Sequence, residues 1–323
     1  MRALVVGGAG YVGSAVVRHL LRSDWDVTVL DALYTGRREN LPGSVPFYRN
    51  DCGIVASVED VLKSAAFDLV ISSMALGGPA RSLKFPLPYH HNNFLAHFYL
   101  LRALLAGRGV RKFLLLSDFS VYGSAVSCPI GPETEKRPDT PLGHSLCATE
   151  NLLADLALAS GLDFAVVRFG SAAGALPEGS AGPILPDGAR RFPSAAFAVA
   201  LGKEQSLPIL GTTFSTVDGT ALRDPIHVAD VADAVEKAVG DLMRRSGGRE
   251  FVLGSGRPVS VGEWLQTIKL VTQREIPTER TDPAPFDAPA LYGDPADGAS
   301  ALGWRARRDI RQMVEDEWRL LKK

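Results

Sequence analysis

Apolar residues in the first half of the chain follow two alternating patterns. Six short, mostly apolar runs have the length of strands, at residues 3–8, 26–32, 46–51, 67–73, 112–118 and 163–170. Between them, residues 13–25, 58–66, 92–109 and 145–161 repeat apolar positions at the spacing of a helix. Because the strand runs are almost continuously apolar, we expect a doubly wound parallel sheet of the α/β class, covered by helices on both faces.

The pattern changes after Phe169. Residues 170–193 are rich in Gly, Pro and Ala and predict a long loop, and residues 279–298 predict a second one. Helices are expected at 227–243, 259–273 and 309–323, with a strand at 249–256. We therefore expect an α/β domain at 1–168 and a smaller α/β lobe at 169–323, with some chain crossing back to the first domain.

The composition excludes several classes of protein. With 46% hydrophobic and 22% charged residues and a net charge of −1, the chain is typical of soluble proteins and has no overall excess of positive charge to attract nucleic acid. There is no apolar run of about 18 residues and no leader ahead of the first strand. The three cysteines have no metal-type spacing. We expect a cytoplasmic protein without a metal, nucleic-acid or membrane partner.

A glycine pattern joins the first strand to the first helix. In "VVGGAGYVGS", Gly7, Gly10 and Gly13 form G-x-x-G-x-x-G, and Tyr11 and Val12 lie between the last two glycines. Glycines at this junction let backbone N–H groups approach a pyrophosphate, and the helix N-terminus adds a partial positive charge. The segment predicts the phosphate-binding turn of a dinucleotide site.

Two carboxylates end the neighbouring strands. Asp31 follows the second strand, where an acid accepts the ribose hydroxyls of adenosine and repels a 2′-phosphate, so it favours NAD over NADP. Asp51 ends the third strand and is placed to meet the adenine amino group, although an ordinary loop aspartate is an equal alternative.

Several longer segments carry a family resemblance. The glycine turn, "LPYHHNNFLAHFYLLRA", "SVYG" before "PETE", "LRDPIHVADVA" and "LGW" resemble the extended short-chain dehydrogenase/reductases, and within them the NAD-dependent nucleotide-sugar epimerases and dehydratases. The resemblance runs nearly end to end. It implies that residues 1–168 form a Rossmann-like domain that binds NAD as cofactor. It further implies a nucleoside diphosphate sugar as substrate and a homodimer through residues 93–105 and 146–159.

The resemblance also assigns residues to these ligands. It implies that Asn93 lies near the nicotinamide and that Arg223, with Arg280 as a looser match, holds the substrate diphosphate through guanidinium–phosphate pairs. Further expected cofactor contacts are Cys52, Met74 and Ser117, and further expected substrate contacts are Arg81 and Ser171.

The family's reaction centre is where this chain departs from the pattern. The family's catalytic Tyr and Lys lie four residues apart on one helix face, so that the lysine can lower the tyrosine pKa. In "TPLGHSL" these two positions are Leu142 and Leu146, and the family's serine before "VYG" is Asp118. The two leucines predict a packing face in place of a proton relay.

Three residues are candidates for the missing acid–base role. Asp118 beside apolar leucines is expected to be desolvated with a raised pKa, as suits a general base, although capping the following turn is an equal alternative. Tyr122 belongs to the family's "VYG" segment, where it usually has a supporting role. His144 is two residues from Leu142 and should point away from the leucine stripe.

Three functions stay open at this point. The chain is a nucleotide-sugar epimerase or dehydratase with an atypical centre around Asp118, or a non-redox lyase, isomerase or cyclase that keeps NAD as a structural group. The third possibility is an inactive protein that binds NAD and a nucleotide sugar. The sequence favours the first but does not decide among them.

Overall fold

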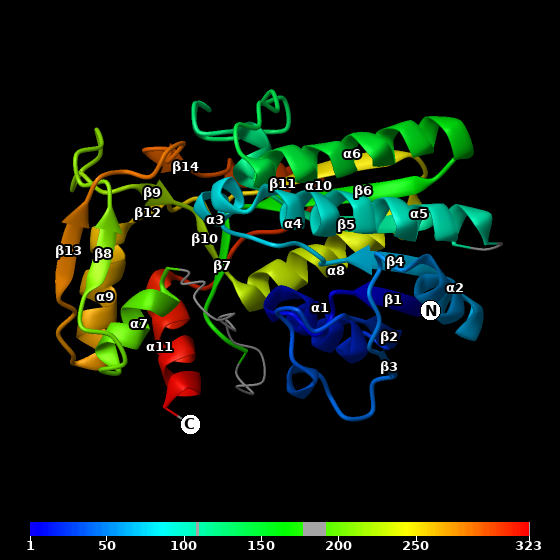
Figure 1. Ribbon diagram of the computed structural model, residues 1–323, viewed down its shortest axis with the longest axis horizontal. Helices are drawn as coiled ribbons and strands as arrows, with labels where there is room; N and C mark the ends of the chain where they lie inside the picture. The colour runs from blue at the N-terminus through cyan, green and yellow to red at the C-terminus, as the bar shows by residue number, and fades with distance from the viewer. Residues whose placement is uncertain (108–109, 177–191, 323) are drawn as a thin grey trace.

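A seven-stranded parallel sheet forms the centre of the computed structural model, which describes residues 1–107, 110–176 and 192–322 (Figure 1). Its strands run in the order β3–β2–β1–β4–β5–β6–β11. They are β1 (Arg2–Val6), β2 (Asp26–Leu30), β3 (Phe47–Tyr48), β4 (Leu69–Ser72), β5 (Lys112–Asp118), β6 (Asp163–Phe169) and β11 (Gly248–Leu253). The six strands predicted in the first half and the doubly wound Rossmann-like class are confirmed.

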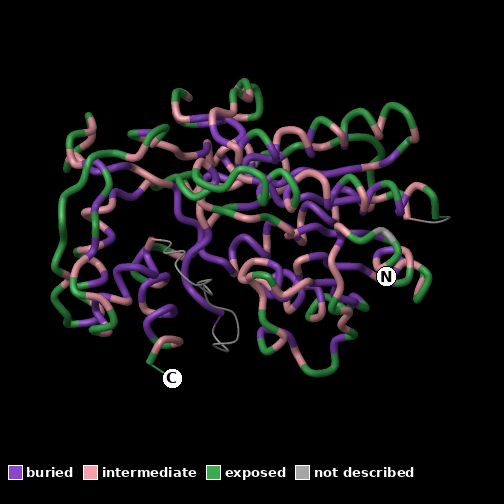
Figure 2. Tube along the Cα trace, in the orientation of Figure 1, coloured by how far each residue is buried: buried purple, intermediate pink, exposed green. Residues whose placement is uncertain are grey.

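Helices cover both faces of this sheet. Helices α1 (Tyr11–Arg22) and α8 (Val228–Arg244) pack side by side on one face, and α2 (Val55–Ser64), α5 (Ala96–Ala106) and α6 (Pro141–Ser160) cover the other (Figure 1). Along β1, side chains alternate between the two layers: Val5 packs in the α1–α8 core, and Leu4 and Val6 pack in the opposite core. Figure 2 shows these strands buried on both sides.

The second half of the chain divides between the sheet and a smaller lobe. Strand β11 pairs with β6, and α8 packs on α1, so residues from beyond 169 complete the central layers. Trp304 secures this return, because its indole Nε1 donates to the Asp230 carbonyl of α8 at 3.0 Å. The carboxyl end of β6 therefore leads into the lobe, and the chain later returns to add β11 as the edge strand beside β6.

The lobe has its own core, built around Phe197, Trp264 and Trp318. Its helices are α7 (Ser194–Ala200), α9 (Val261–Thr272) and α11 (Ile310–Leu321). Its strands are β7 (Ser171–Ala173) with β10 (Pro225–His227), β8 (Leu207–Leu210) with β13 (Thr278–Thr281), and β9 (Leu222–Arg223) between β12 (Val259–Ser260) and β14 (Ala290–Leu291). In Figure 1 it lies at the left.

The prediction of a structureless loop at 279–298 is wrong. This segment contains most of β13, all of β14 and the start of α10 (Pro295–Leu302), which begins with a proline and is capped by the Asp294 carboxylate. Strands of four and two residues and a helix of two turns are too short to produce a periodic pattern. The other predicted loop, 170–193, contains β7, and its residues 177–191 lie outside the described part.

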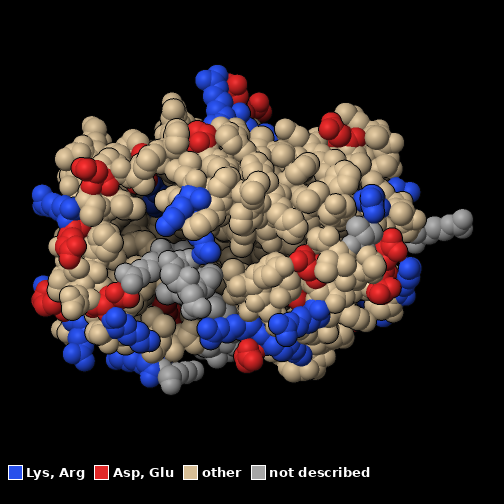
Figure 3. All heavy atoms as spheres, viewed as in Figure 1, with Lys and Arg blue, Asp and Glu red and all other residues tan. Residues whose placement is uncertain are grey.

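The remaining helical segments are short. They are η1 (Arg38–Asn40), α3 (Pro79–Lys84), α4 (Pro86–Tyr89), the π-helix η2 (His90–Leu95) and η3 (Phe119–Tyr122). On the face seen in Figure 3, basic and acidic side chains are interspersed. Within the described residues, the model contains no helix with both the length and the apolar character needed to cross a membrane.

Candidate active site

The glycine turn brings backbone, rather than side chains, to the N-terminus of α1. Gly7 has a φ of +74°, which favours glycine, and its Cα faces the backbone of Ser73 in the loop after β4. A Cβ atom at Gly13 would lie 2.2 Å from the Gly7 carbonyl oxygen, a backbone atom that cannot move aside. The turn is therefore closed against any side chain at this point, and the N-terminus of α1 that follows it suits an anion.

Asp31 is fixed at the end of β2 by the same turn. Its carboxylate accepts the Ala9 N–H at 2.9 Å and the Leu33 N–H at 2.7 Å. Burial raises the pKa of Asp31, and these two hydrogen bonds oppose the rise. The carboxylate is thus aimed across the turn in the position expected of an adenosine-ribose acceptor.

A pocket opens in front of the turn and the carboxyl ends of β1, β2 and β4. Its walls include the predicted residues Gly7, Gly10, Asp31, Asp51, Cys52 and Met74. It is also lined by Tyr34, Asn50, Ser73, Leu76 and Asn92, which sequence reasoning did not single out. Except for Asn92, which lies in the π-helix η2 (His90–Leu95), they are in the loops that follow β2, β3 and β4, and that position was the available signal.

Tyr34 closes one side of this pocket. Its hydroxyl donates to the Asp51 carboxylate at 2.5 Å, and the other Asp51 oxygen accepts the Gly53 N–H at 2.7 Å. The thiol of Cys52 is buried beside them, and burial raises its pKa to about 12, so it stays protonated at neutral pH. Asp51 is consequently held in one orientation toward the pocket.

Asn93 lies behind the pocket, fully buried in the π-helix. Its side-chain carbonyl accepts the Leu76 N–H at 2.8 Å, and its amide donates to the Leu76 carbonyl at 3.2 Å and to Ser145 Oγ at 3.3 Å. The side chain thus ties the loop after β4 to α6. Its neighbour Asn92, not Asn93, is among the pocket-lining residues.

A buried histidine supports this arrangement. His97 contacts Ser72 Oγ through Nε2 and the Asn93 carbonyl through Nδ1, both at 2.8 Å. Burial lowers the pKa of His97 to about 4, so the ring is neutral near pH 7. It fixes the end of β4 relative to the π-helix, and π-turns of this kind often occur at functional sites.

The leucines of α6 are buried. Leu142 and Leu146 are each 1% exposed and pack in one cluster with Tyr89, Phe119 and Tyr122. The Tyr89 hydroxyl donates to the carbonyl of Gly77 at 2.7 Å, at the far end of the loop after β4. This face of α6 is therefore a packing face, as its sequence predicts.

Asp118 is at the carboxyl end of β5, beside this cluster. Its carboxylate accepts the Ser120 N–H at 2.6 Å and also the Ser120 hydroxyl, and so caps η3. Asp118 thus caps the turn that follows it, as the alternative interpretation of the sequence predicts. His144 is exposed, with Nε2 at 3.0 Å from the Pro138 carbonyl, and is not brought to the pocket.

A group of buried charges that sequence reasoning missed lies behind the leucine face. Arg168 of β6 holds the fully buried Glu150 carboxylate with two bonds, of 3.0 and 2.7 Å, and also contacts Glu250 at 2.6 Å. Lys136 Nζ adds a 3.1 Å contact to Glu150. Burial works against the charged guanidinium, but the bonds to Glu150 outweigh it and raise the pKa of Arg168.

Two of the predicted site residues belong to this group. The Ser117 hydroxyl donates to Glu150 at 2.6 Å, and Arg168 donates to the Tyr122 hydroxyl at 3.2 Å. Burial raises the pKa of Tyr122 despite the nearby guanidinium. Both hydroxyls are thus committed to buried partners in this structure, a role that an apolar sequence context does not reveal.

The expected substrate residues come from four different elements, and the Ser171 N–H donates to the carbonyl of Asp224, next to Arg223, at 3.3 Å. Arg223 is partly exposed, donates to the Ala288 carbonyl at 2.8 Å and pairs with the Asp287 carboxylate. Burial lowers the pKa of Arg223 and raises that of Asp287. Arg81 on α3, Ser171 at the start of β7 and Arg280 on β13 complete the set, and both arginines are exposed.

Comparison with known proteins places this geometry in a family. The model of the "NAD dependent epimerase/dehydratase family" matches residues 3–254, which include the glycine turn, the pocket and the α6 face. The chain belongs to this family. It is accordingly an NAD-dependent enzyme of the extended short-chain dehydrogenase/reductase type, and NAD is the cofactor that the pocket and Asp31 fit.

Relatives are similar along the whole chain. The UDP-glucose 4-epimerase of Azospirillum brasilense is 35% identical over 308 residues, which cover 95% of this chain and 88% of the relative. That of Bacillus subtilis (strain 168) is 33% identical, with 99% and 96% covered. The UDP-glucose-4-epimerase of Stenotrophomonas maltophila, solved with bound NAD and formylated UDP-arabinopyranose, has a TM-score of 0.93 at 29% identity, with 100% and 98% covered.

Proposed function

We propose that this enzyme binds NAD and a nucleoside diphosphate sugar, with UDP-sugars as the first candidates, and acts on the sugar through an acid–base centre around Asp118. When bound, NAD supplies a hydride acceptor for the sugar. The observation that carries the proposal is the contrast between an intact dinucleotide pocket and an α6 face that offers two buried leucines. Asp118, at the end of β5, is an ionisable side chain close to this face.

Asp118 and Ser120 form a carboxylate–hydroxyl pair at that place. The Ser120 hydroxyl donates to the Asp118 carboxylate, so its own proton can pass to that carboxylate as the serine oxygen takes a proton from the sugar. Asp118 ends β5 and Ser120 follows it, at the carboxyl edge of the parallel sheet where ligands of such folds bind. In this proposal Asp118 is the base, and Ser120 orients its carboxylate.

The substrate diphosphate is assigned to Arg223. Its guanidinium is partly exposed, and its contact with Asp287 leaves donor N–H groups for a bidentate pair with phosphate oxygens. The relatives named as UDP-glucose 4-epimerases and the neighbour crystallised with a UDP-arabinopyranose derivative support a uridine nucleotide. Asp287 then sets how much of the Arg223 charge is available.

Purified protein incubated with UDP-, dTDP- and GDP-sugars tests the function. We expect an epimer or a 4-keto product from at least one UDP-sugar, and Asp118→Asn should lower its rate by about 10² to 10⁴-fold. Asp139→Asn is the matched control, because Asp139 accepts the Ser124 N–H and hydroxyl in the same way, in the loop before α6. Equal loss in both variants would indicate a structural effect.

A second candidate function has its own support in the burial of α6. An NAD and nucleotide-sugar binding protein without turnover needs no proton relay, and Leu142 and Leu146 provide none. Tight binding of both ligands by calorimetry, with no product by mass spectrometry over days, would favour it. Product formed equally by protein freed of NAD would instead favour a non-redox lyase, isomerase or cyclase with NAD as a structural group.

We also propose a homodimer through α5 and α6. Phe98 on α5 is 38% exposed and Leu158 on α6 is 89% exposed, and burying such side chains against a second copy removes apolar surface from water. Light scattering should report a dimer for the wild type and a monomer for a Phe98→Glu, Leu158→Lys double variant. A wild-type monomer contradicts the proposal.

A further inference from the structure

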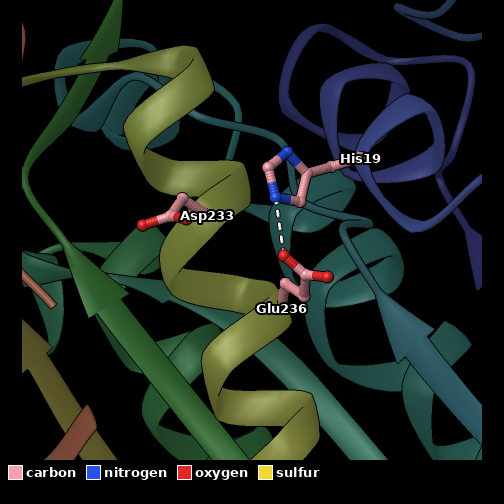
Figure 4. Close-up of side chains that lie close together, drawn as sticks. All are labelled: His19, Asp233 and Glu236. Atoms are coloured by element: carbon pink, nitrogen blue, oxygen red, sulfur yellow. Dashed lines mark hydrogen bonds and ion pairs between the residues drawn. The ribbon is translucent and has the colours of Figure 1, made fainter. Parts of the chain in front are cut away.

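His19, Asp233 and Glu236 lie together on the sheet face opposite α5 and α6, away from the residues that line the pocket. His19 is in the last turn of α1, and Asp233 and Glu236 are three residues apart on α8, so both acids project from one side of that helix. The chain separates His19 from Glu236 by 217 residues. Only the packing of α1 against α8 brings the three side chains together (Figure 4).

The ligand atoms of these three residues converge. His19 Nε2 lies 2.7 Å from Glu236 Oε2, and one ligand atom from each residue lies within 4.8 Å of the other two. Ligands of a tetrahedral zinc ion stand about 2.0–2.2 Å from it and hence about 3.4 Å from each other. Movements of about 1 Å in the side-chain positions would therefore let the three atoms bind one ion.

The charges of the group also favour a cation. The Asp233 carboxylate has no hydrogen-bond or ion-pair partner among the described residues, and it lies on the same face of α8 as the Glu236 carboxylate. One imidazole faces two carboxylates, so a divalent ion would compensate the excess negative charge. The ordinary alternative, in which Glu236 bonds only to His19 and to the Ser23 hydroxyl, leaves Asp233 without a role.

We propose that His19 Nε2 and the carboxylates of Asp233 and Glu236 bind a zinc-class divalent ion that fastens α1 to α8. One nitrogen and two oxygen donors suit zinc better than magnesium or calcium, which prefer all-oxygen sites. The His19 and Glu236 side chains are 26% and 32% exposed, so water can fill the remaining coordination positions. The ion would act on stability, because it holds the helix that begins at the glycine turn.

Zinc titration of tag-free, chelator-treated protein tests the site. We expect calorimetry to give one equivalent of zinc bound and the Tm to rise with zinc to a plateau. His19→Gln and Asp233→Asn should each weaken zinc binding at least about tenfold, because each removes a direct ligand. Far-UV circular dichroism and NAD binding without zinc must match the wild type, which shows that the variants fold.

His90→Gln is the matched control, because His90 is an exposed histidine on the opposite side of the sheet. It should keep the full zinc-dependent Tm rise. The proposal is overturned if the wild type binds no zinc at micromolar concentrations, or if His19→Gln and Asp233→Asn bind it as tightly as His90→Gln does. A Tm rise produced by magnesium but not by zinc would contradict the donor argument.

Discussion

The glycine turn and the α6 face differ in what their functions require of side chains. At the turn, backbone N–H groups, the absence of Cβ atoms and one carboxylate are sufficient, and all are present in Gly7, Gly13 and Asp31. On α6, the family's chemistry needs two particular side chains, and here both positions are buried leucines. Binding and chemistry can thus diverge separately on one scaffold, because the fold supplies the first and single side chains supply the second.

The largest effect on cofactor binding is expected from Gly13→Ala. The new Cβ would meet the Gly7 carbonyl oxygen at 2.2 Å, and only a backbone shift of the turn can relieve the clash. NAD affinity by calorimetry should fall by at least about 100-fold, equivalent to about 2.7 kcal/mol. Gly43→Ala, where the added atom meets nothing within 4 Å, should bind NAD as the wild type does. Unchanged affinity in Gly13→Ala would remove the turn from the cofactor site.

A substitution of Arg168, in the buried charged group behind Leu142 and Leu146, is expected to lower stability. Arg168→Met leaves the buried Glu150 without its bidentate partner, and breaking a buried pair in this way costs about 3–5 kcal/mol. Chemical denaturation should show this loss in the free energy of unfolding. Arg137→Met, which removes an exposed pair with Glu135, should leave stability nearly unchanged. Similar stability in both variants would mean that the buried charges are dispensable.

His97 makes the free energy of unfolding depend on pH. Its pKa is about 4 in the folded protein, lowered from 6.5 by burial, so the unfolded chain binds the proton first as the pH falls. The free energy of unfolding should therefore decrease between about pH 6.5 and about pH 4, by about 3 kcal/mol from this group. His97→Gln should lose that slope and His90→Gln should keep it, as measured by denaturation across the range.

Much of the difference between the glycine turn and the α6 face was predictable from the sequence. The continuous apolar strands, the spacing of Gly7, Gly10 and Gly13, and the buried character of Leu142 and Leu146 depend on local patterns, and the structure contains each of them. The partners of Asn93, Ser117 and Tyr122 were not predictable. Those side chains are held by residues far along the chain, such as Arg168 and Leu76, and only the folded sheet brings these pairs together.

The smallest effect is expected at the edge of the pocket. Tyr34→Phe removes the hydroxyl that orients Asp51, a single hydrogen bond at a partly solvated site. Such a bond contributes about 0.5–1.5 kcal/mol, so NAD affinity should fall about 2–10-fold. Tyr99→Phe on α5, outside the pocket lining, serves as the control. Equal affinity of all three proteins would mean that Asp51 needs no support from Tyr34.

The central claim is that the glycine turn binds NAD and that Asp118 carries the chemistry. Its most direct test is the formation of enzyme-bound NADH on mixing the NAD-loaded protein with a UDP-sugar that it converts. The account predicts that the wild type forms NADH and that Asp118→Asn does so about 100-fold or more slowly, while both bind NAD equally. NADH formation at the wild-type rate in Asp118→Asn, or sugar conversion by the wild type without any NADH, would contradict it.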